Sequence, residues 1–184
     1  ESPDERPAVE VGGFWSRVEG VTLRAPHAAT GLILNGAALE IHDVALEQIH
    51  TMPAGGGDTP VTGLWIREPA ARVSDVRIAG IAGEARAGRT DASGVQIDEE
   101  AGDVVLLGLD VSDIRAADAP RSAFRARGGA AFGVRALGAP RLKVVDTRLW
   151  DLWGGLGSGD AALSLGQGGD GGPATGLWVG SSAD

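Results

Sequence analysis

The chain has 184 residues, no cysteine and a net charge of −9. This length suffices for one domain with a hydrophobic core, and the lack of cysteine excludes disulfides and thiolate metal sites. The negative charge disfavours non-specific binding to nucleic acid, and no apolar run reaches the length of about 18 residues that predicts a membrane span. We therefore expect no nucleic-acid partner and no membrane span.

The start of the chain, Glu1 to Pro7, is rich in proline and acidic residues and does not begin with methionine. Such a start is typical of a mature chain after removal of a signal peptide. We therefore expect an extracytoplasmic protein (periplasmic, secreted or cell-surface). Residues 1–17 are predicted to form an N-terminal extension or cap, with Phe14 and Trp15 plugging the first end of the core.

A short phrase recurs along the chain, in which a glycine precedes alternating apolar residues. The phrases begin at Gly31, Gly63, Gly94, Gly133 and Gly176, at spacings of 32, 31, 39 and 43 residues. Regular spacing of this size is typical of repeat proteins. Alternation with a period of two predicts β-strands, with Leu64 and Ile66 on one face and Trp65 on the other. Recurring glycine argues against helical repeats, which it would weaken.

A second recurring segment lies between the phrases and contains two apolar stretches separated by glycine or aspartate. Both residue types tolerate the left-handed backbone conformation that a sharp bend requires. The predicted bends are Gly20, Asp43, Asp75, Gly108 and Asp146. Each repeat is therefore expected to contain three short strands.

Three strands per repeat predict an all-β fold, namely a single-stranded right-handed parallel β-helix (solenoid) of about five coils. We expect it over residues 18–179, with residues 180–184 as a C-terminal tail. The repeats lengthen only in their last connection, which predicts long loops on one face, a common position for a binding surface. Those loops are 51–62, 83–93, 116–132 and 154–175.

With its three-strand coil, its Asp or Gly bend and its one long variable loop, the chain resembles the pectate-lyase-like right-handed β-helix family over roughly residues 18–179. That family includes lyases, glycosidases, epimerases, phage spikes, adhesins and non-catalytic scaffolds, so the resemblance implies a fold more than an activity. The catalytic motifs Asp-Pro-His-Glu, Gly-Asp-Asp and Ser/Gly-His-Gly are absent. We therefore assign no catalytic residue, no cofactor and no metal.

Two of the long loops are rich in arginine, a residue suited to binding carboxylate or sulfate through its planar fork. The residues are Arg86, Arg89, Arg121, Arg125 and Arg127. In polysaccharide lyases of the resembled family an arginine also acts as the base, so binding or cleavage of an acidic polysaccharide is one hypothesis. The alternative is that nearby Glu84, Asp91 and Asp118 neutralise the cluster.

Tryptophan is frequent for a chain with three Phe and no Tyr. Trp65 and Trp178 are expected on the outward side of their strands, in a column with Ile33, Gln96 and Arg135, while Trp150 and Trp153 flank the last strand of the fourth repeat. Outward tryptophans pack under a loop, stack on a sugar or anchor a protein interface. All four are our candidates for partner binding.

The remaining candidates each have a structural alternative. Asp43 and Asp75 either share a proton or a cation or cap their own bends. The histidines are interpreted as solvated surface residues, with a minor alternative in which His50 and Asp58 form an acid–base pair. The glycine-rich run 154–160 is interpreted as a flexible loop because its calcium-binding pattern does not repeat.

Little sequence follows the last phrase at Gly176, which predicts an open C-terminal end of the solenoid that a protein partner or another copy covers. The leading hypothesis is therefore a non-catalytic scaffold or accessory subunit that docks onto a larger, extracytoplasmic protein assembly. Binding or cleavage of an acidic polysaccharide is the alternative.

Overall fold

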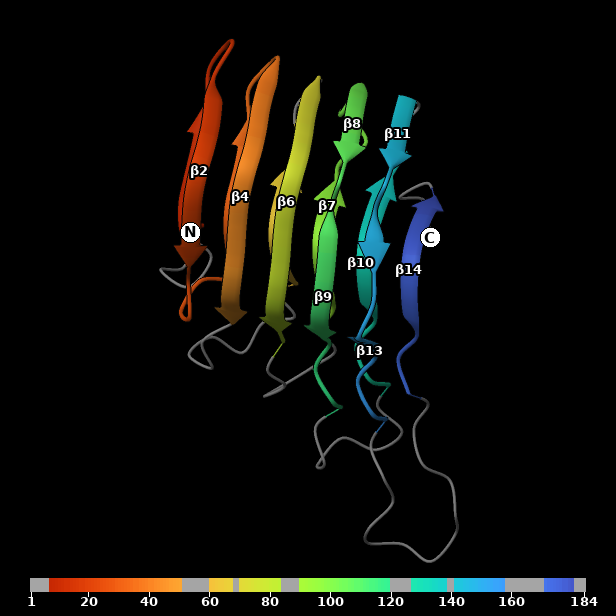
Figure 1. Ribbon diagram of the computed structural model, residues 1–184. Helices are drawn as coiled ribbons and strands as arrows, with labels where there is room; N and C mark the ends of the chain where they lie inside the picture. The colour runs from red at the N-terminus through yellow and green to blue at the C-terminus, as the bar shows by residue number, and fades with distance from the viewer. Residues whose placement is uncertain are drawn as a thin grey trace, which may run out of the picture.

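The computed structural model describes residues 7–50, 60–67, 70–83, 90–119, 127–138, 141–157 and 171–180. Within these residues the chain forms fourteen strands and no helix. It follows that the described part contains no helix able to cross a membrane. The strands form two mostly parallel sheets, one of six strands and one of eight. Figure 1 shows the strands of each sheet running side by side.

The six-stranded sheet takes one strand from each pass of the chain. Its order is β1 (Val9–Gly12), β3 (Thr30–Asn35), β5 (Val61–Ile66), β7 (Ala92–Ile97), β10 (Ala131–Leu137) and β14 (Ala174–Gly180). The recurring glycine phrases lie on the last five of these strands. Adjacent phrases pair in parallel and in register, since Leu32 pairs with Leu64 and Leu64 with Val95.

The eight-stranded sheet is made of the second recurring segment. Its strands are β2 (Arg17–Arg24), β4 (Leu39–His50), β6 (Ala71–Ala82), β8 (Asp103–Leu107), β9 (Asp110–Arg115), β11 (Arg141–Val145), β12 (Arg148–Leu149) and β13 (Leu152–Trp153). They make five successive rows, since β8 and β9 both pair with β6, β11 pairs with β8, and β12 and β13 pair with β9. Over the described residues the chain alternates between the two sheets.

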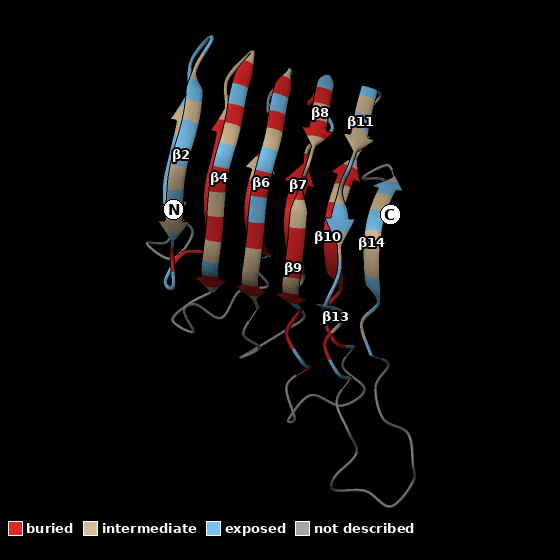
Figure 2. Cartoon of the chain, in the orientation of Figure 1, coloured by how far each residue is buried: buried red, intermediate tan, exposed pale blue. Residues whose placement is uncertain are grey.

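One hydrophobic core lies between the sheets and is lined by the inward-facing apolar residues of their strands. In the six-stranded sheet Leu64, Val95 and Val134 are fully buried, and in the eight-stranded sheet so are Val73 and Leu106. The alternation is plain in Figure 2, where buried and exposed residues succeed one another along β4 and β6. Apolar burial of this kind is the main source of stability in such a fold.

The recurring glycine is required by close packing, not by an unusual φ angle. A Cβ at Gly63 would lie 2.6 Å from Cγ2 of Ile78 and 2.7 Å from the carbonyl oxygen of Gly94. Both distances are shorter than van der Waals contact. Glycine recurs because the strand of one sheet approaches both the core side chains of the other sheet and the next strand of its own.

All five predicted bends adopt the left-handed conformation, with φ values from 49° to 64°. The bend nevertheless does not divide the segment into strands of different sheets. His42 pairs with Ser74 before the bend, and Val44 pairs with Val76 after it. The left-handed residue turns the strand while the parallel ladder continues on both sides of it.

The predicted right-handed parallel β-helix with three strands per coil is therefore wrong. The second and third strands predicted for each repeat lie in the same eight-stranded sheet, and the described residues form two sheets and no closed solenoid. A second set of left-handed residues, five positions after the first, was not predicted. It consists of Gln48, Gly80, Asp113 and Asp151, with φ values from 51° to 69°.

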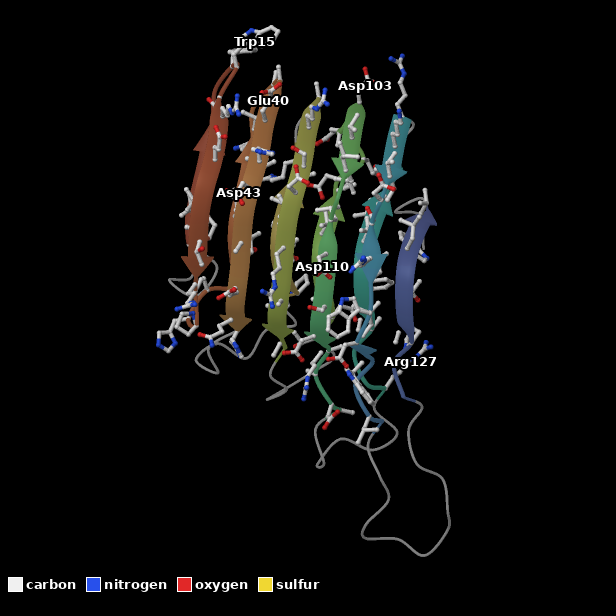
Figure 3. The ribbon with its side chains drawn as sticks, in the orientation of Figure 1. Trp15, Glu40, Asp43, Asp103, Asp110 and Arg127 are labelled. Carbon is white, nitrogen blue, oxygen red and sulfur yellow. The ribbon has the colours of Figure 1, made fainter. Side chains whose placement is uncertain are left out.

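The N-terminal residues do not plug the core. Phe14 and Trp15 are 80% and 85% exposed, and Figure 3 shows Trp15 projecting beyond the end of the sheet. The prediction of an aromatic plug is wrong because these residues lie in the turn between β1 and β2, where neither sheet faces them. β1 itself belongs to the six-stranded sheet, paired with β3.

Candidate functional site

The first candidate surface is the outer face of the six-stranded sheet. Its central column contains Ile33, Trp65, Gln96, Arg135 and Trp178, in register on adjacent strands. The register expected from the sequence is thus confirmed. The column places two tryptophans three strands apart, with a polar and a cationic side chain between them.

Trp65 is held by its own chain. Its indole Nε1 donates a hydrogen bond of 2.8 Å to Oδ1 of Asp98, and the guanidinium of Arg67 lies 5.2 Å from the ring centroid. Arg67 also approaches Oδ2 of Asp98, at 3.7 Å. Cation–π stacking and the hydrogen bond together orient a half-buried ring. These contacts favour packing on the sheet over a freely accessible ring.

Trp178 is held in a similar way by Arg135 and Phe132. The guanidinium of Arg135 lies 5.7 Å from the Trp178 centroid and 5.1 Å from that of Phe132, and the two rings are 6.2 Å apart. Nη1 of Arg135 lies 3.6 Å from Oδ2 of Asp91. A role for Trp65 and Trp178 in binding a partner stays a prediction, and both rings already have contacts within the chain.

The second candidate surface, which we call the C-terminal edge, is the last layer of the core. It consists of Leu142, Val144, Leu149, Leu152, Leu177 and Val179. The last two, on β14, are 46% and 57% exposed. Val134 and Ala136, which precede them in the same columns, are fully buried.

Figure 2 makes the same contrast visible, because β7 and β10 are largely buried whereas β11 and β14 carry no buried residue. Substantial exposure of two inward-facing apolar side chains is unusual for a sheet interior. The apolar alternation of the sequence predicts Leu177 and Val179 as inward-facing residues. Their exposure could not be predicted from it, because the burial of a side chain depends on which strands lie opposite it.

Two further tryptophans lie beside the C-terminal edge. Trp150 and Trp153 are 55% and 59% exposed. Their indole nitrogens donate hydrogen bonds to Oδ1 of Asp110 at 2.8 Å and to Oδ1 of Asp151 at 2.5 Å. Each bond fixes the orientation of the ring while leaving much of it open to solvent. Of the four predicted tryptophans, these two are the most accessible.

The predicted arginine cluster falls almost wholly outside the described residues, which include neither Arg86, Arg89, Arg121 nor Arg125. Arg127 is described, and it is exposed near the lower end of the sheets (Figure 3). Of the acidic residues expected to neutralise the cluster, Asp91 accepts a hydrogen bond from the backbone of Ala130 and pairs with Arg135. Binding of an acidic polysaccharide by these arginines stays a prediction.

The described bases of the long connections pack tightly against one another. Gly129 donates a backbone hydrogen bond to Ala117, Gly155 donates to Gly129, and Gly172 donates to Gly155. A side chain at Gly155 would collide with the carbonyl of Ala117. The start of the glycine-rich run 154–160 is therefore explained by close backbone packing, and residues 158–160 lie outside the described part.

The histidines do not form a catalytic arrangement within the described residues. Nδ1 of His42 lies 3.0 Å from Oγ of Ser74 and 3.3 Å from Oδ2 of Asp75. A Ser–His–Asp triad requires the two partners on different ring nitrogens, so this trio cannot relay a proton. His50 lines a hollow of about 400 Å³ with Asp113 and Arg115. Its suggested partner Asp58 lies outside the described residues.

The described residues also contain no group of three or more His, Asp or Glu side chains able to hold a metal ion. Asp75 pairs with His42, and Asp43 is exposed at its bend (Figure 3). Both residues have the left-handed φ expected for a bend. The described geometry therefore favours bend formation over a shared cation as the reason for these aspartates.

Comparison with known proteins gives no relative: no protein-family model, no curated protein and no solved structure matches the chain. The resemblance to the pectate-lyase-like family has no match to support it and stays a prediction. A function for this chain is therefore inferred from its own geometry.

Proposed function

We propose that the chain is a non-catalytic docking scaffold, or accessory subunit, of a larger protein assembly. The observation that carries this proposal is the exposure of Leu177 and Val179, at 46% and 57%, in columns whose preceding members are fully buried. An exposed continuation of a core is a surface that gains stability when a partner covers it. The C-terminal edge is the proposed contact surface.

Full burial of a leucine or valine side chain contributes about 1.5–3 kcal/mol. Leu177 and Val179 have about half of that burial still to gain, and the partly buried Leu142 and Leu149 belong to the same C-terminal edge. Trp150 and Trp153 flank this surface, and tryptophan is enriched among the residues that dominate binding energy at protein interfaces.

The expectation of an extracytoplasmic location is part of this proposal, and it depends only on the composition of the first residues. Fractionation of the native source tests it. A chain found in the cytoplasm would contradict this part and leave the docking surface in place.

The docking proposal is tested by introducing charge at the edge. In the double variant Leu177→Glu, Val179→Glu we expect loss of the proteins that co-purify and cross-link with the wild-type chain from its native source. The matched control is Val9→Glu, which changes a 36% exposed residue at the opposite end of the same column as Leu177. The control should retain every partner.

Circular dichroism distinguishes lost docking from lost folding, and both positions of the double variant are already exposed. Retention of the cross-linked partners by the double variant would contradict the proposal. So would a wild-type chain that purifies as a monomer with nothing bound.

A further inference from the structure

The outer face of the eight-stranded sheet contains a hollow of about 400 Å³. It spans β4, β6 and β9, which lie side by side in Figure 1, and each of these strands is paired on both sides. Two outward columns cross the hollow, and β6 has the smallest member of each, Gly80 and Ala82. On β4 and β9 the same columns contain the polar residues Gln48, His50, Asp113 and Arg115. The two small residues form the floor of the hollow, and the four polar residues form its walls.

The wall on β9 has a positive and a negative group next to each other. Nε of Arg115 donates a hydrogen bond of 2.7 Å to Oδ1 of Asp113, and this bond holds the two side chains together. The terminal nitrogens Nη1 and Nη2 of Arg115 and the oxygen Oδ2 of Asp113 form no hydrogen bond with a described residue. Oδ2 lies over the floor, 3.8 Å from the place that a Cβ at Gly80 would take. This wall therefore offers cationic donors beside an anionic acceptor.

The two charges of this wall select the class of ligand. An organic cation would be repelled by Arg115, and an organic anion would be repelled by Asp113. The net charge of −9 disfavours an anion further. A zwitterion, in contrast, places its negative group on Arg115 and its positive group on Asp113. It is the class of ligand that brings neither side chain into contact with a like charge.

The opposite wall, on β4, is polar and carries no carboxylate. It lies two strand spacings away, about 10 Å, and consists of Gln48 and His50. Neither side chain forms a hydrogen bond with another residue in the described ranges. The amide of Gln48 both donates and accepts hydrogen bonds, and a neutral imidazole does the same. A carboxamide group, which also donates and accepts, complements this wall.

We propose that the hollow binds a free α-amino acid with a carboxamide side chain, a function beyond docking and at a different place from the C-terminal edge. The carboxylate and the ammonium of an α-amino acid are attached to one carbon, so they lie next to each other as the free ends of Arg115 and Asp113 do. The carboxylate accepts hydrogen bonds from Arg115, and the ammonium donates to Oδ2 of Asp113. The side chain of the ligand crosses the floor and pairs with Gln48. A volume of about 400 Å³ is within the range of small-molecule sites.

Isothermal titration calorimetry of the full chain with L-glutamine tests the proposal. N-acetyl-L-glutamine lacks the ammonium, and the α-amide of L-glutamine lacks the α-carboxylate. Each derivative should bind about ten-fold more weakly than L-glutamine, because each loses one hydrogen bond between charged groups. L-leucine retains both charges but has no carboxamide. Its affinity should therefore be lower than that of L-glutamine by a smaller factor.

Variants of the chain test whether the ligand lies in the hollow. Asp113→Asn removes the partner of the ammonium and should weaken the binding of L-glutamine about ten-fold. Asparagine tolerates the left-handed φ of 51° at this position. The matched control is Asp43→Asn, at an exposed bend of β4 that also has a φ of 51° and does not line the hollow. This control should bind as the wild type does. Ala82→Leu fills the floor without removing a polar group and should abolish binding.

Any of three results would overturn the proposal: no binding of L-glutamine at about 10 mM, equal affinity for L-glutamine and its N-acetyl derivative, or wild-type affinity in the Asp113→Asn or the Ala82→Leu variant. Circular dichroism and the thermal midpoint establish that each variant is folded. The Leu177→Glu, Val179→Glu variant changes no residue of the hollow, so it should bind L-glutamine as the wild type does. Failure of ligand binding therefore leaves the docking proposal in place, and failure of docking leaves this site in place.

Discussion

The middle of the molecule and its C-terminal end are built from the same columns of residues, yet they differ in burial. Leu64 and Ile66 on β5 are fully buried, whereas Leu177 and Val179 in the same two columns are 46% and 57% exposed. The residue types are nearly the same. What differs is the number of neighbouring rows in the opposite sheet, so burial in this fold is a property of position along the stack.

The largest test of this comparison is truncation of one leucine in each region. Leu64→Ala should lower the free energy of unfolding by about 3 kcal/mol, because it removes buried apolar contacts and leaves a cavity. Leu177→Ala, in the same column, should cost less than about 1 kcal/mol because solvent already replaces part of its surroundings. Urea denaturation followed by tryptophan fluorescence measures both. Equal losses of free energy of unfolding would show that Leu177 is packed as well as Leu64 and would contradict the comparison.

A second test uses the recurring glycine. Gly63→Ala should destabilise the protein by about 1–3 kcal/mol, since the added Cβ would lie 2.6 Å from Ile78 and 2.7 Å from the carbonyl of Gly94. At Gly176 the nearest atoms to an added Cβ are those of Leu149, at 3.7 Å and beyond. Gly176→Ala should therefore leave the thermal midpoint within a few degrees of wild type. A large loss at Gly176 would contradict the packing explanation.

Part of the fold was predictable from the sequence and part was not. Strand positions and the bends at Asp43 and Asp75 were predictable, because period-two alternation and residues that tolerate a left-handed φ are local signals. The division into sheets was not, because it depends on whether the ladder continues through the bend. That is decided by hydrogen bonds between residues about 30 positions apart, such as those around His42 and Ser74.

The candidate sites follow the same rule. The column shared by Trp65 and Trp178 was predictable from strand register alone. The partners of Trp65, Asp98 and Arg67, were not, because they depend on the side-chain conformations that the folded sheet imposes on residues just beyond the ends of β7 and β5. The aromatic plug of Phe14 and Trp15 failed for a related reason: hydrophobic residues at an end stay exposed when no layer lies opposite them.

The bends provide a comparison in which the two regions should behave alike. Gln48 lies on β4, which has a paired strand on each side, and Asp151 lies in the last described row of the eight-stranded sheet. Both residues have a φ of 55°. The second set of bends was missed at the sequence level because glutamine is not a typical left-handed residue, although Gly80 and Asp113 lie at the same spacing after the first bend. A left-handed φ is a local cost of about 1–2 kcal/mol for a residue with a Cβ, independent of the neighbouring rows.

Gln48→Gly is therefore expected to raise the free energy of unfolding by as much as about 1 kcal/mol, because glycine removes the left-handed cost and adds a smaller entropic one. Asp151→Gly gains less backbone relief, because aspartate tolerates a left-handed φ better than glutamine does, and it also loses the hydrogen bond from Trp153. Its net gain should be smaller by about 1 kcal/mol. Ala45→Gly, in the strand before Gln48, is the control and should lose about 0.5–1 kcal/mol. If Gln48→Gly lowers the free energy of unfolding as much as Ala45→Gly does, the left-handed φ of Gln48 has no local cost. The neighbouring strands then determine the conformation of the bend.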